Sequence, residues 1–155
     1  IGNPDSECAY FGDFVPAGEG FNVTPDGLTA NTTAAFAIVK SGSIWCGQRM
    51  IVPQAWRADR PWSRLRGLLG RAPLHAGAAQ ALWLVPCASI HTIGMRYALD
   101  VVFLDRAGSV LAWHEAVPPW RARRCGGARH TVELAAGSLA DLDLQRGEIW
   151  QWHAA

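Results

Sequence analysis

Leu99-Asp100-Val101-Val102-Phe103-Leu104-Asp105 sets the expected fold class of this chain. Its four consecutive apolar residues, 101–104, include two β-branched residues and one aromatic residue, which is typical of a strand. The run is far shorter than the roughly eighteen apolar residues that a membrane helix needs. A turn sequence, Arg106-Ala107-Gly108, follows it, and residues 109–117 then resemble a second strand. We therefore expect a β-rich fold and no insertion into a membrane.

Strand-like patterns recur on both sides of this pair. Pro61 can begin a helix in which Trp62, Leu65, Leu68 and Leu69 recur at helical spacing until Gly70. The other expected strands are 43–46 and 49–56, which meet near Gly47-Gln48, and 81–85, 129–134 and 148–152; residues 139–142 suit a short helical turn. The simplest fold that buries this pattern is α+β and mostly β: a small barrel-like antiparallel sheet with one short capping helix, preceded by an N-terminal arm that contains a strand.

The composition indicates one folded core. The chain has 155 residues, of which 50% are apolar and 17% charged, and a formal net charge of +1. This length suits one domain, and the apolar content excludes a disordered chain. A net charge near zero gives no general electrostatic reason to expect a nucleic acid as partner.

Charge and aromatic content divide the chain into two parts. Residues 1–41 hold five acidic residues against Lys40 and many Gly and Pro turn signals. Residues 42–155 hold thirteen arginines against eight acidic residues, and all eight tryptophans. Because large aromatic side chains bury the most area, we expect a single β-rich domain at 42–155 and an arm at 1–41 that does not fold alone.

The first residue and the cysteines favour an exported protein. The chain begins at Ile1 without an initiator Met, which we interpret as a mature secreted chain, extracellular or periplasmic. Four cysteines without a CxxC pair suit two disulfides better than a zinc site, and pairing Cys8 with Cys46 and Cys87 with Cys125 is the favoured of three connectivities. Four buried thiols are the alternative. Asn22 and Asn31 begin glycosylation acceptor triplets, which are common by chance.

Four blocks in the second part together resemble a known family. They are Trp62-Ser63-Arg64-Leu65-Arg66-Gly67-Leu68-Leu69-Gly70-Arg71, Cys87-Ala88-Ser89-Ile90-His91-Thr92-Ile93-Gly94-Met95-Arg96, 99–105 and Val132-Glu133-Leu134-Ala135-Ala136-Gly137. In order and spacing they resemble the bacterial and archaeal domain of unknown function numbered 192, over about residues 43–153. The resemblance implies a small β-rich, barrel-like α+β fold, often in exported proteins. It implies no established activity, and it does not extend to residues 1–40.

Within these blocks, His91, Met95 and Asp100 form the candidate ligand pocket. A strand or tight loop could bring His91 and Asp100 together, where an imidazole and a carboxylate can share a proton. An uncharacterised hydrolase or transferase is therefore one hypothesis. The competing interpretation is structural: Asp100 caps a turn or pairs with Arg96, His91 satisfies buried backbone groups, and Met95 fills the core.

Other chemistry finds little support in the sequence. There is no phosphate-binding glycine loop, no nucleophile elbow and no HExxH motif, so no catalytic residue or cofactor is assigned. The five histidines lack metal-ligand spacing, so no metal is assigned; they are His75, His91, His114, His130 and His153. The basic stretch Trp120-Arg121-Ala122-Arg123-Arg124 with Arg129 could bind a polyanion, but a solvated loop between Pro118-Pro119 and Gly126-Gly127 is the plainer interpretation.

The arm carries the main functional hypothesis. In residues 33–39 the strand period puts Ala34, Phe36 and Ile38 on one face and Val39 on the other, so both faces can be buried. Such a strand can complete the chain's own sheet, or it can be added to the sheet edge of a second copy. Head-to-tail repetition of the second arrangement gives a filament.

These observations lead to one leading hypothesis and one alternative. We expect a secreted, non-enzymatic structural protein that assembles with itself into an extracellular filament through its arm. The alternative is a monomeric extracytoplasmic domain that binds a small ligand or a partner near His91, Met95 and Asp100.

Overall fold

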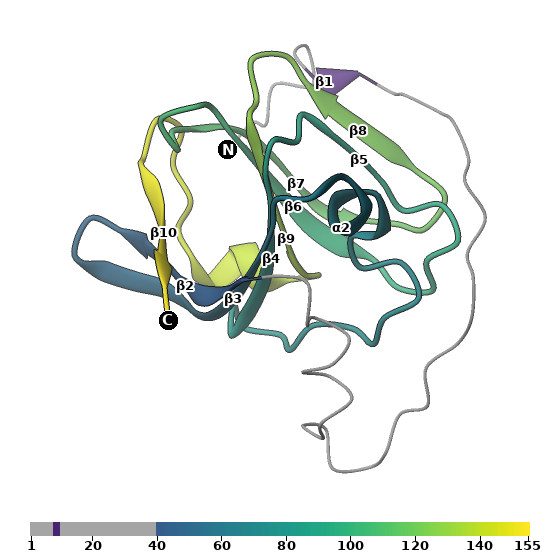
Figure 1. Ribbon diagram of the computed structural model, residues 1–155, viewed down its shortest axis with the longest axis horizontal. Coiled ribbons are helices and arrows are strands. Elements are labelled where there is room, and N and C mark those ends of the chain that lie inside the picture. The colour runs from purple at the N-terminus through teal and green to yellow at the C-terminus, as the bar shows by residue number, and fades with distance from the viewer. Residues whose placement is uncertain (1–7, 10–39) are drawn as a thin grey trace.

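The computed structural model describes residues 8–9 and 40–155, which form a β-rich fold with one short α-helix in the described part (Figure 1). In chain order the elements are β1 (Cys8–Ala9), β2 (Lys40–Cys46), β3 (Arg49–Ala58), α2 (Pro61–Arg66), β4 (Gln80–Leu84), β5 (Ser89–His91), β6 (Leu99–Leu104), β7 (Val110–Val117), β8 (Ala122–Cys125), β9 (His130–Ala135), the 3-10 helix η2 (Ser138–Asp141) and β10 (Trp150–Ala154). The mostly β fold with a short helix is confirmed.

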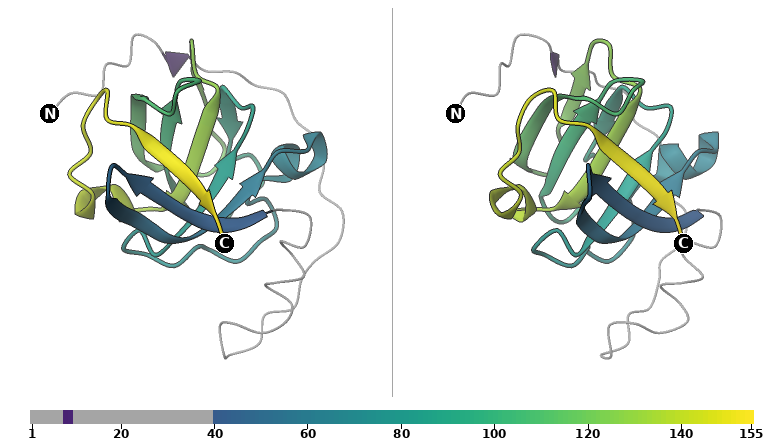
Figure 2. Two further views of the ribbon diagram at one scale, coloured as in Figure 1. Left: turned by 60° about the vertical axis from the view of Figure 1, so that its left-hand side comes forward. Right: turned by 90° about the vertical axis from the view of Figure 1, so that its left-hand side faces the viewer.

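The larger sheet has the strand order β10-β2-β3-β4-β9-β6-β7 among the described residues. It differs from the expected sheet in two respects. β3 and β4 are parallel, from Gln54 opposite Gln80 to Ala58 opposite Leu84, because the chain returns through α2 to the same end of the sheet. The sheet is also not closed by a ladder of paired strands. Between its end strands β7 and β10 the chain forms the isolated bridge of Ser109 with Ile149, flanked by backbone hydrogen bonds from Val110 N–H to Glu148 O (2.9 Å) and from Trp150 N–H to Gly108 O (2.9 Å). Figure 2 shows β10, one of these end strands, side by side with β2.

A smaller sheet, β1-β8-β5, lies with α2 on one side of the larger sheet (Figure 1). β6 is buried on both faces because the layers cover both. Its side chains alternate between two apolar clusters, with Val101 and Phe103 on the α2 side and Val102 and Leu104 on the side of β2 and β10. The continuous apolar run noted in the sequence is thus a central strand between two cores.

The helix α2 is shorter than its apolar spacing predicts. It begins at Pro61, where Ser63 Oγ accepts a hydrogen bond from the backbone N–H of Arg60 (3.2 Å), and it ends at Arg66. Trp62 is 80% exposed and Leu65 43% exposed, whereas Leu68, beyond the helix, is buried. The helix therefore ends before Gly70, where the apolar spacing predicts its end, because the chain leaves the helical conformation before Leu68.

The basic stretch expected as a loop is partly strand β8, which pairs with β5 through Ile90 and Arg123. The short strands β5 and β8 were missed because neither shows a clear alternation of its own.

The cysteine and arm hypotheses meet the structure only in part. Cys46 and Cys87 are free thiols, so neither expected bond, Cys8 with Cys46 or Cys87 with Cys125, is formed in this structure. The side chain of Cys8 and the strand expected at 34–39, with Ala34, Phe36, Ile38 and Val39, lie outside the described residues, as do Asn22 and Asn31. Among the described residues, no helix combines the length and apolar character needed to cross a membrane.

Candidate functional site

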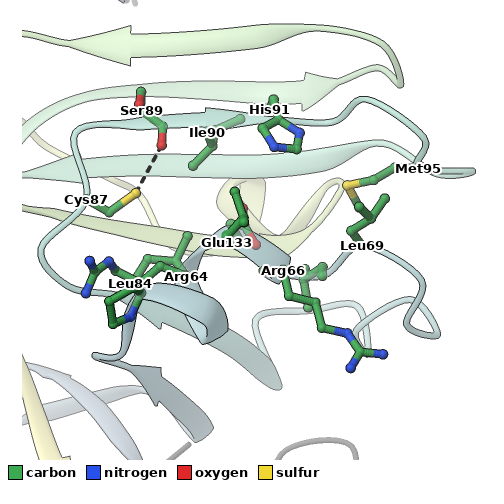
Figure 3. Close-up of a pocket in the computed structure, with 14 residues that line it drawn as sticks. Arg64, Arg66, Leu69, Leu84, Cys87, Ser89, Ile90, His91, Met95 and Glu133 are labelled. Carbon is green, nitrogen blue, oxygen red and sulfur yellow. Dashed lines mark hydrogen bonds between the residues drawn. The ribbon is translucent and has the colours of Figure 1, made fainter. Parts of the chain in front are cut away.

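A pocket of about 540 Å³ opens between α2, the strand β5 and the centre of the large sheet (Figure 3). Its floor is Glu133, which lies on β9 opposite Leu82 of β4 and Val101 of β6. The strand period places Val132 and Leu134 in the opposite cluster, so Glu133 faces α2. We call this cavity the Glu133 pocket.

Apolar side chains make most of its wall. They come from α2 and the segment after it, from β4 and β5, and from the loop before β6: Leu65, Leu68, Leu69, Leu84, Ile90 and Met95. Tyr97 fixes the segment after α2, because its hydroxyl shares its proton between the carbonyl oxygens of Arg71 (3.0 Å) and Leu68 (3.2 Å). The pocket thus has a shaped apolar wall around a polar floor, the usual pattern of a small-molecule site.

Glu133 is a buried acid with an unsatisfied oxygen. The residue is 4% exposed, and its Oε2 is buried and accepts no hydrogen bond. Burial raises the pKa of Glu133 to about 7, although the positive charge of Arg71 opposes this rise. The carboxyl group is therefore divided between its neutral and ionised forms at neutral pH.

Gly67 brings the end of α2 against this carboxyl group. Its φ of +48° is in the left-handed region, and a Cβ atom there would lie 3.4 Å from Glu133 Oε2. A larger residue would therefore be strained by this φ, and its Cβ atom would reach van der Waals contact with the carboxyl group. The N–H of Gly67 is already used, because it donates to the carbonyl of Ser63 (3.1 Å).

His91 and Met95, two of the three residues expected to form a ligand pocket, line the Glu133 pocket. His91 lies on the β5 side of the pocket in Figure 3, and its Nδ1 is buried without a hydrogen-bond partner. Burial lowers the pKa of His91, so its imidazole is neutral at pH 7. A neutral imidazole and a partly neutral carboxyl group are suited to hydrogen bonding rather than to ion pairing.

Asp100 does not line the pocket with them. It is fully buried, and its Oδ1 accepts the backbone N–H of Ala116 (2.8 Å) while its Oδ2 accepts that of Leu139 (2.9 Å). These bonds tie β7 and η2 to β6. The structure therefore places Asp100 apart from His91 and Met95, in the capping role of the structural interpretation.

Cys87 is the only cysteine that lines the pocket within the described part of the chain. Its thiol donates to the carbonyl oxygen of Ser89 (3.0 Å), drawn as the dashed line in Figure 3. Burial raises the pKa of the Cys87 thiol, so the reactive thiolate is scarce at neutral pH. The arrangement therefore favours binding over nucleophilic catalysis by Cys87.

The rim of the pocket is basic. Arg64 and Arg66 project from α2, and Figure 3 shows them on either side of the pocket. Arg64 Nη1 donates to the carbonyl oxygen of Asp59 (2.9 Å), which anchors α2 to the end of β3. In the part of the chain that the structure describes, no cluster of three or more His, Cys, Asp or Glu residues could hold a metal ion.

Comparisons with known proteins place the chain among uncharacterised relatives. Residues 46–152 match the family described as DUF192, an uncharacterised ACR. A UPF0127 protein of Thermococcus sibiricus is 31% identical over 118 residues, which are 72% of this chain and 70% of that protein.

Two solved structures share the fold. One is a putative transcription regulator from Sinorhizobium meliloti 1021, with a TM-score of 0.60, 16% identity, and coverage of 74% of this chain and 93% of the other. The second is a protein of unknown function from Novosphingobium aromaticivorans, with a TM-score of 0.59, 15% identity, and coverage of 91% of this chain and 100% of the other. At these identities the similarity concerns the fold alone.

Proposed function

Because the chain belongs to the DUF192 (UPF0127) family, whose description names no activity, we propose its function from the Glu133 pocket itself: the domain binds a small, mainly apolar molecule that carries a hydrogen-bond donor. The observation that carries this proposal is the unpartnered Oε2 of Glu133 on the floor of an apolar cavity.

The energetics favour a ligand at this point. A buried oxygen without a partner costs roughly 1–3 kcal/mol relative to one that is hydrogen-bonded. An N–H or O–H group of a ligand restores that bond, while the apolar remainder contacts Leu68, Leu69 and Ile90. A purely structural carboxyl group would be better placed if it bonded to a neighbouring backbone, as Asp100 does.

The test uses a neutral apolar dye with one N–H donor, N-phenyl-1-naphthylamine, whose emission rises in an apolar site. We expect saturable binding to the full chain. Leu69→Trp fills the pocket and should weaken binding about tenfold or more, whereas Ile149→Trp, at an exposed position outside the pocket, should not. Equal binding by the wild type and Leu69→Trp would place the dye elsewhere and contradict the proposal.

A second variant separates binding from structure. Glu133→Leu removes the acceptor and should weaken dye binding about fivefold, the value of one net hydrogen bond. The same change removes a buried polar group, so it should leave the thermal midpoint equal or higher. A carboxyl group with only a structural role would instead leave dye affinity unchanged.

The filament hypothesis rests on residues 34–39, which lie outside the described residues, so it stays a prediction, as do secretion and the homo-oligomeric state. A ligand-binding domain and an assembling arm are compatible, because they use different parts of the chain.

A further inference from the structure

Two adjoining pockets of about 340 and 370 Å³ lie on the other face of β4 from the Glu133 pocket. Trp83 lines the first, while its neighbour Leu84 lines the Glu133 pocket, and adjacent strand residues point to opposite faces. The two pockets share Arg106 and His130, so they adjoin and make up a single composite site beside β10. We call it the Arg57 site.

The residues that line the Arg57 site carry positive charge and no negative charge, although Asp59 interacts with Arg57 and Asp105 with His130 from outside the lining. Arg57, Arg106 and Arg129 all line it, and no Asp or Glu is among its described lining residues. The nearby Asp105 accepts the backbone N–H groups of Ala107 (2.8 Å) and Ser109 (2.9 Å) through Oδ1, and its negative charge reaches His130, so it offsets part of the positive charge. Arg106 lines both pockets, with Arg57 in one and Arg129 in the other, and this excess of positive charge attracts an anion.

Two buried donors in the same place have no acceptor. They are Nε of Arg57 and the indole Nε1 of Trp152, each buried and without a hydrogen-bond partner. The guanidinium carbon of Arg57 lies 5.3 Å from the centre of a Trp152 ring, so the two donors belong to one unit. Buried donors are rarely left unpaired, so their shared lack of an acceptor points to a ligand that supplies oxygen atoms.

The surrounding residues hold this unit in place. Gly42 on β2 leaves room for the Trp152 ring, because a Cβ atom there would lie 2.7 Å from it. The indole N–H of Trp83 donates to His130 Nδ1 (3.2 Å), which fixes the opposite wall. The site is thus preorganised, and a ligand need not order it.

We propose that the Arg57 site binds a small oxyanion, a phosphate or a carboxylate group. Arg57 and Trp152 donate hydrogen bonds to the anion, and Arg106 and Arg129 add positive charge around it. The guanidinium group presents planar N–H donors that match both kinds of anion, and the indole N–H adds a donor of fixed direction. This site is independent of the Glu133 pocket, so either proposal can fail without the other.

The experiment follows the tryptophan indole N–H signals of the ¹⁵N-labelled full chain by NMR while inorganic phosphate is added at constant ionic strength. The Trp152 signal, assigned by its loss in Trp152→Phe, should shift downfield and saturate. The Trp83 signal should move less, because its proton is already donated to His130. A parallel titration with acetate distinguishes the two anions: the site selects the one that saturates at lower concentration.

Matched variants make the result specific. Arg57→Met should weaken binding about tenfold or more, whereas Arg96→Met, which removes an exposed arginine outside the site, should leave it within about twofold. If Arg57→Met does not fold, Arg106→Met on the exposed turn carries the same test with a several-fold loss. A Trp152 signal that does not saturate with either anion, or an equal loss in the site variant and Arg96→Met, overturns the proposal.

Discussion

A single residue, Glu133, should make the stability of this protein depend on pH. Burial raises its pKa from 4.5 to about 7, so between these values the folded protein keeps a proton that the unfolded chain has lost. The folded state therefore binds more protons, and the free energy of unfolding falls as the pH rises through this window. A pKa shift of this size corresponds to about 3 kcal/mol. The free energy of unfolding is lower by this amount above pH 7 and is unaffected below about pH 4.5.

The measurement is urea unfolding of the wild type and Glu133→Gln at pH 5 and pH 8. The stability of the variant relative to the wild type should rise by roughly 2–3 kcal/mol between the two values. Other titrating groups, such as His91 and His130, are present in both proteins and cancel. Glu115→Gln, at an exposed position, serves as the control and should keep the wild-type pH dependence. If the free energy of unfolding changed equally in the wild type and in Glu133→Gln between pH 5 and pH 8, Glu133 would not be the source of the pH dependence.

The residues of the Glu133 pocket could be predicted from the sequence only in part. His91 and Met95 were assigned to the pocket because they lie in one recognisable block, and the structure places them there. Glu133 was missed, although an acid between Val132 and Leu134 in an apolar strand was a usable signal. Whether its face meets solvent or a second layer depends on α2 and β5, which come from distant parts of the chain. Asp100 lies apart from His91, because nearness in sequence does not bring β6 and β5 into one sheet.

At the scale of elements, strands with a clear apolar pattern or a clear turn sequence beside them could be predicted. The short strands β5 and β8 could not. β2 and β3 were expected from their patterns around Gly47, and β6 and β7 from the turn at 106–108. β8 consists of Ala122-Arg123-Arg124-Cys125, which has no apolar periodicity and is ordered by its neighbours β1 and β5. Pairing with neighbouring strands determines that such a segment is a strand, so its local sequence does not predict it.

The pairing of β1 with β8 leads to a prediction about the cysteines. Cys8 lies directly opposite Cys125 in antiparallel register. Cys125 donates its backbone N–H to Ala88 on the β5 side (3.0 Å), so on the β1 side it occupies a non-hydrogen-bonded position. Opposed Cα atoms there are about 4.5 Å apart, within the range of roughly 4.4–6.8 Å that a disulfide spans. Under oxidising conditions we therefore expect Cys8 to pair with Cys125, in place of the pairing with Cys46 that sequence order favoured.

Peptide mapping after incubation with glutathione disulfide, which takes up the two electrons and becomes two thiols, identifies the bond. We expect the linked peptides to contain Cys8 and Cys125, and Cys125→Ser to abolish the link. Cys87→Ser should leave it unchanged. A bond between Cys8 and Cys46, or between Cys87 and Cys125, would contradict the register and support the sequence-based pairing.

At the scale of the whole molecule, the sequence determined the fold class and the division of charge, because both depend on summed patterns that survive errors in single elements. The parallel pairing of β3 with β4 was not foreseen, because it depends on the path of the chain through α2 and the connection to Gln80. The predicted assembly is also a property of the whole molecule. The strand expected to mediate it, at 34–39, lies before Lys40.

Removal of residues 1–39 tests that determinant. Residues 40–155 hold both apolar clusters, and Lys40 begins β2 with its Nζ 2.8 Å from Asp59 Oδ2, so a chain cut before Lys40 keeps the larger sheet. We expect the shortened protein to fold and to sediment as a monomer, while the full chain forms larger species as its concentration rises. Sedimentation velocity and negative-stain microscopy measure both.

Point variants then locate the interaction within the arm. Phe36→Asp in the full chain places a charge in the strand expected at 34–39 and removes an apolar contribution of roughly 1.5–3 kcal/mol, so it should abolish assembly as the truncation does. Phe11→Asp, outside that strand, is the matched control and should still assemble. A full chain that remains monomeric at every concentration contradicts the filament prediction. Assembly by the shortened chain instead assigns the interface to residues 40–155.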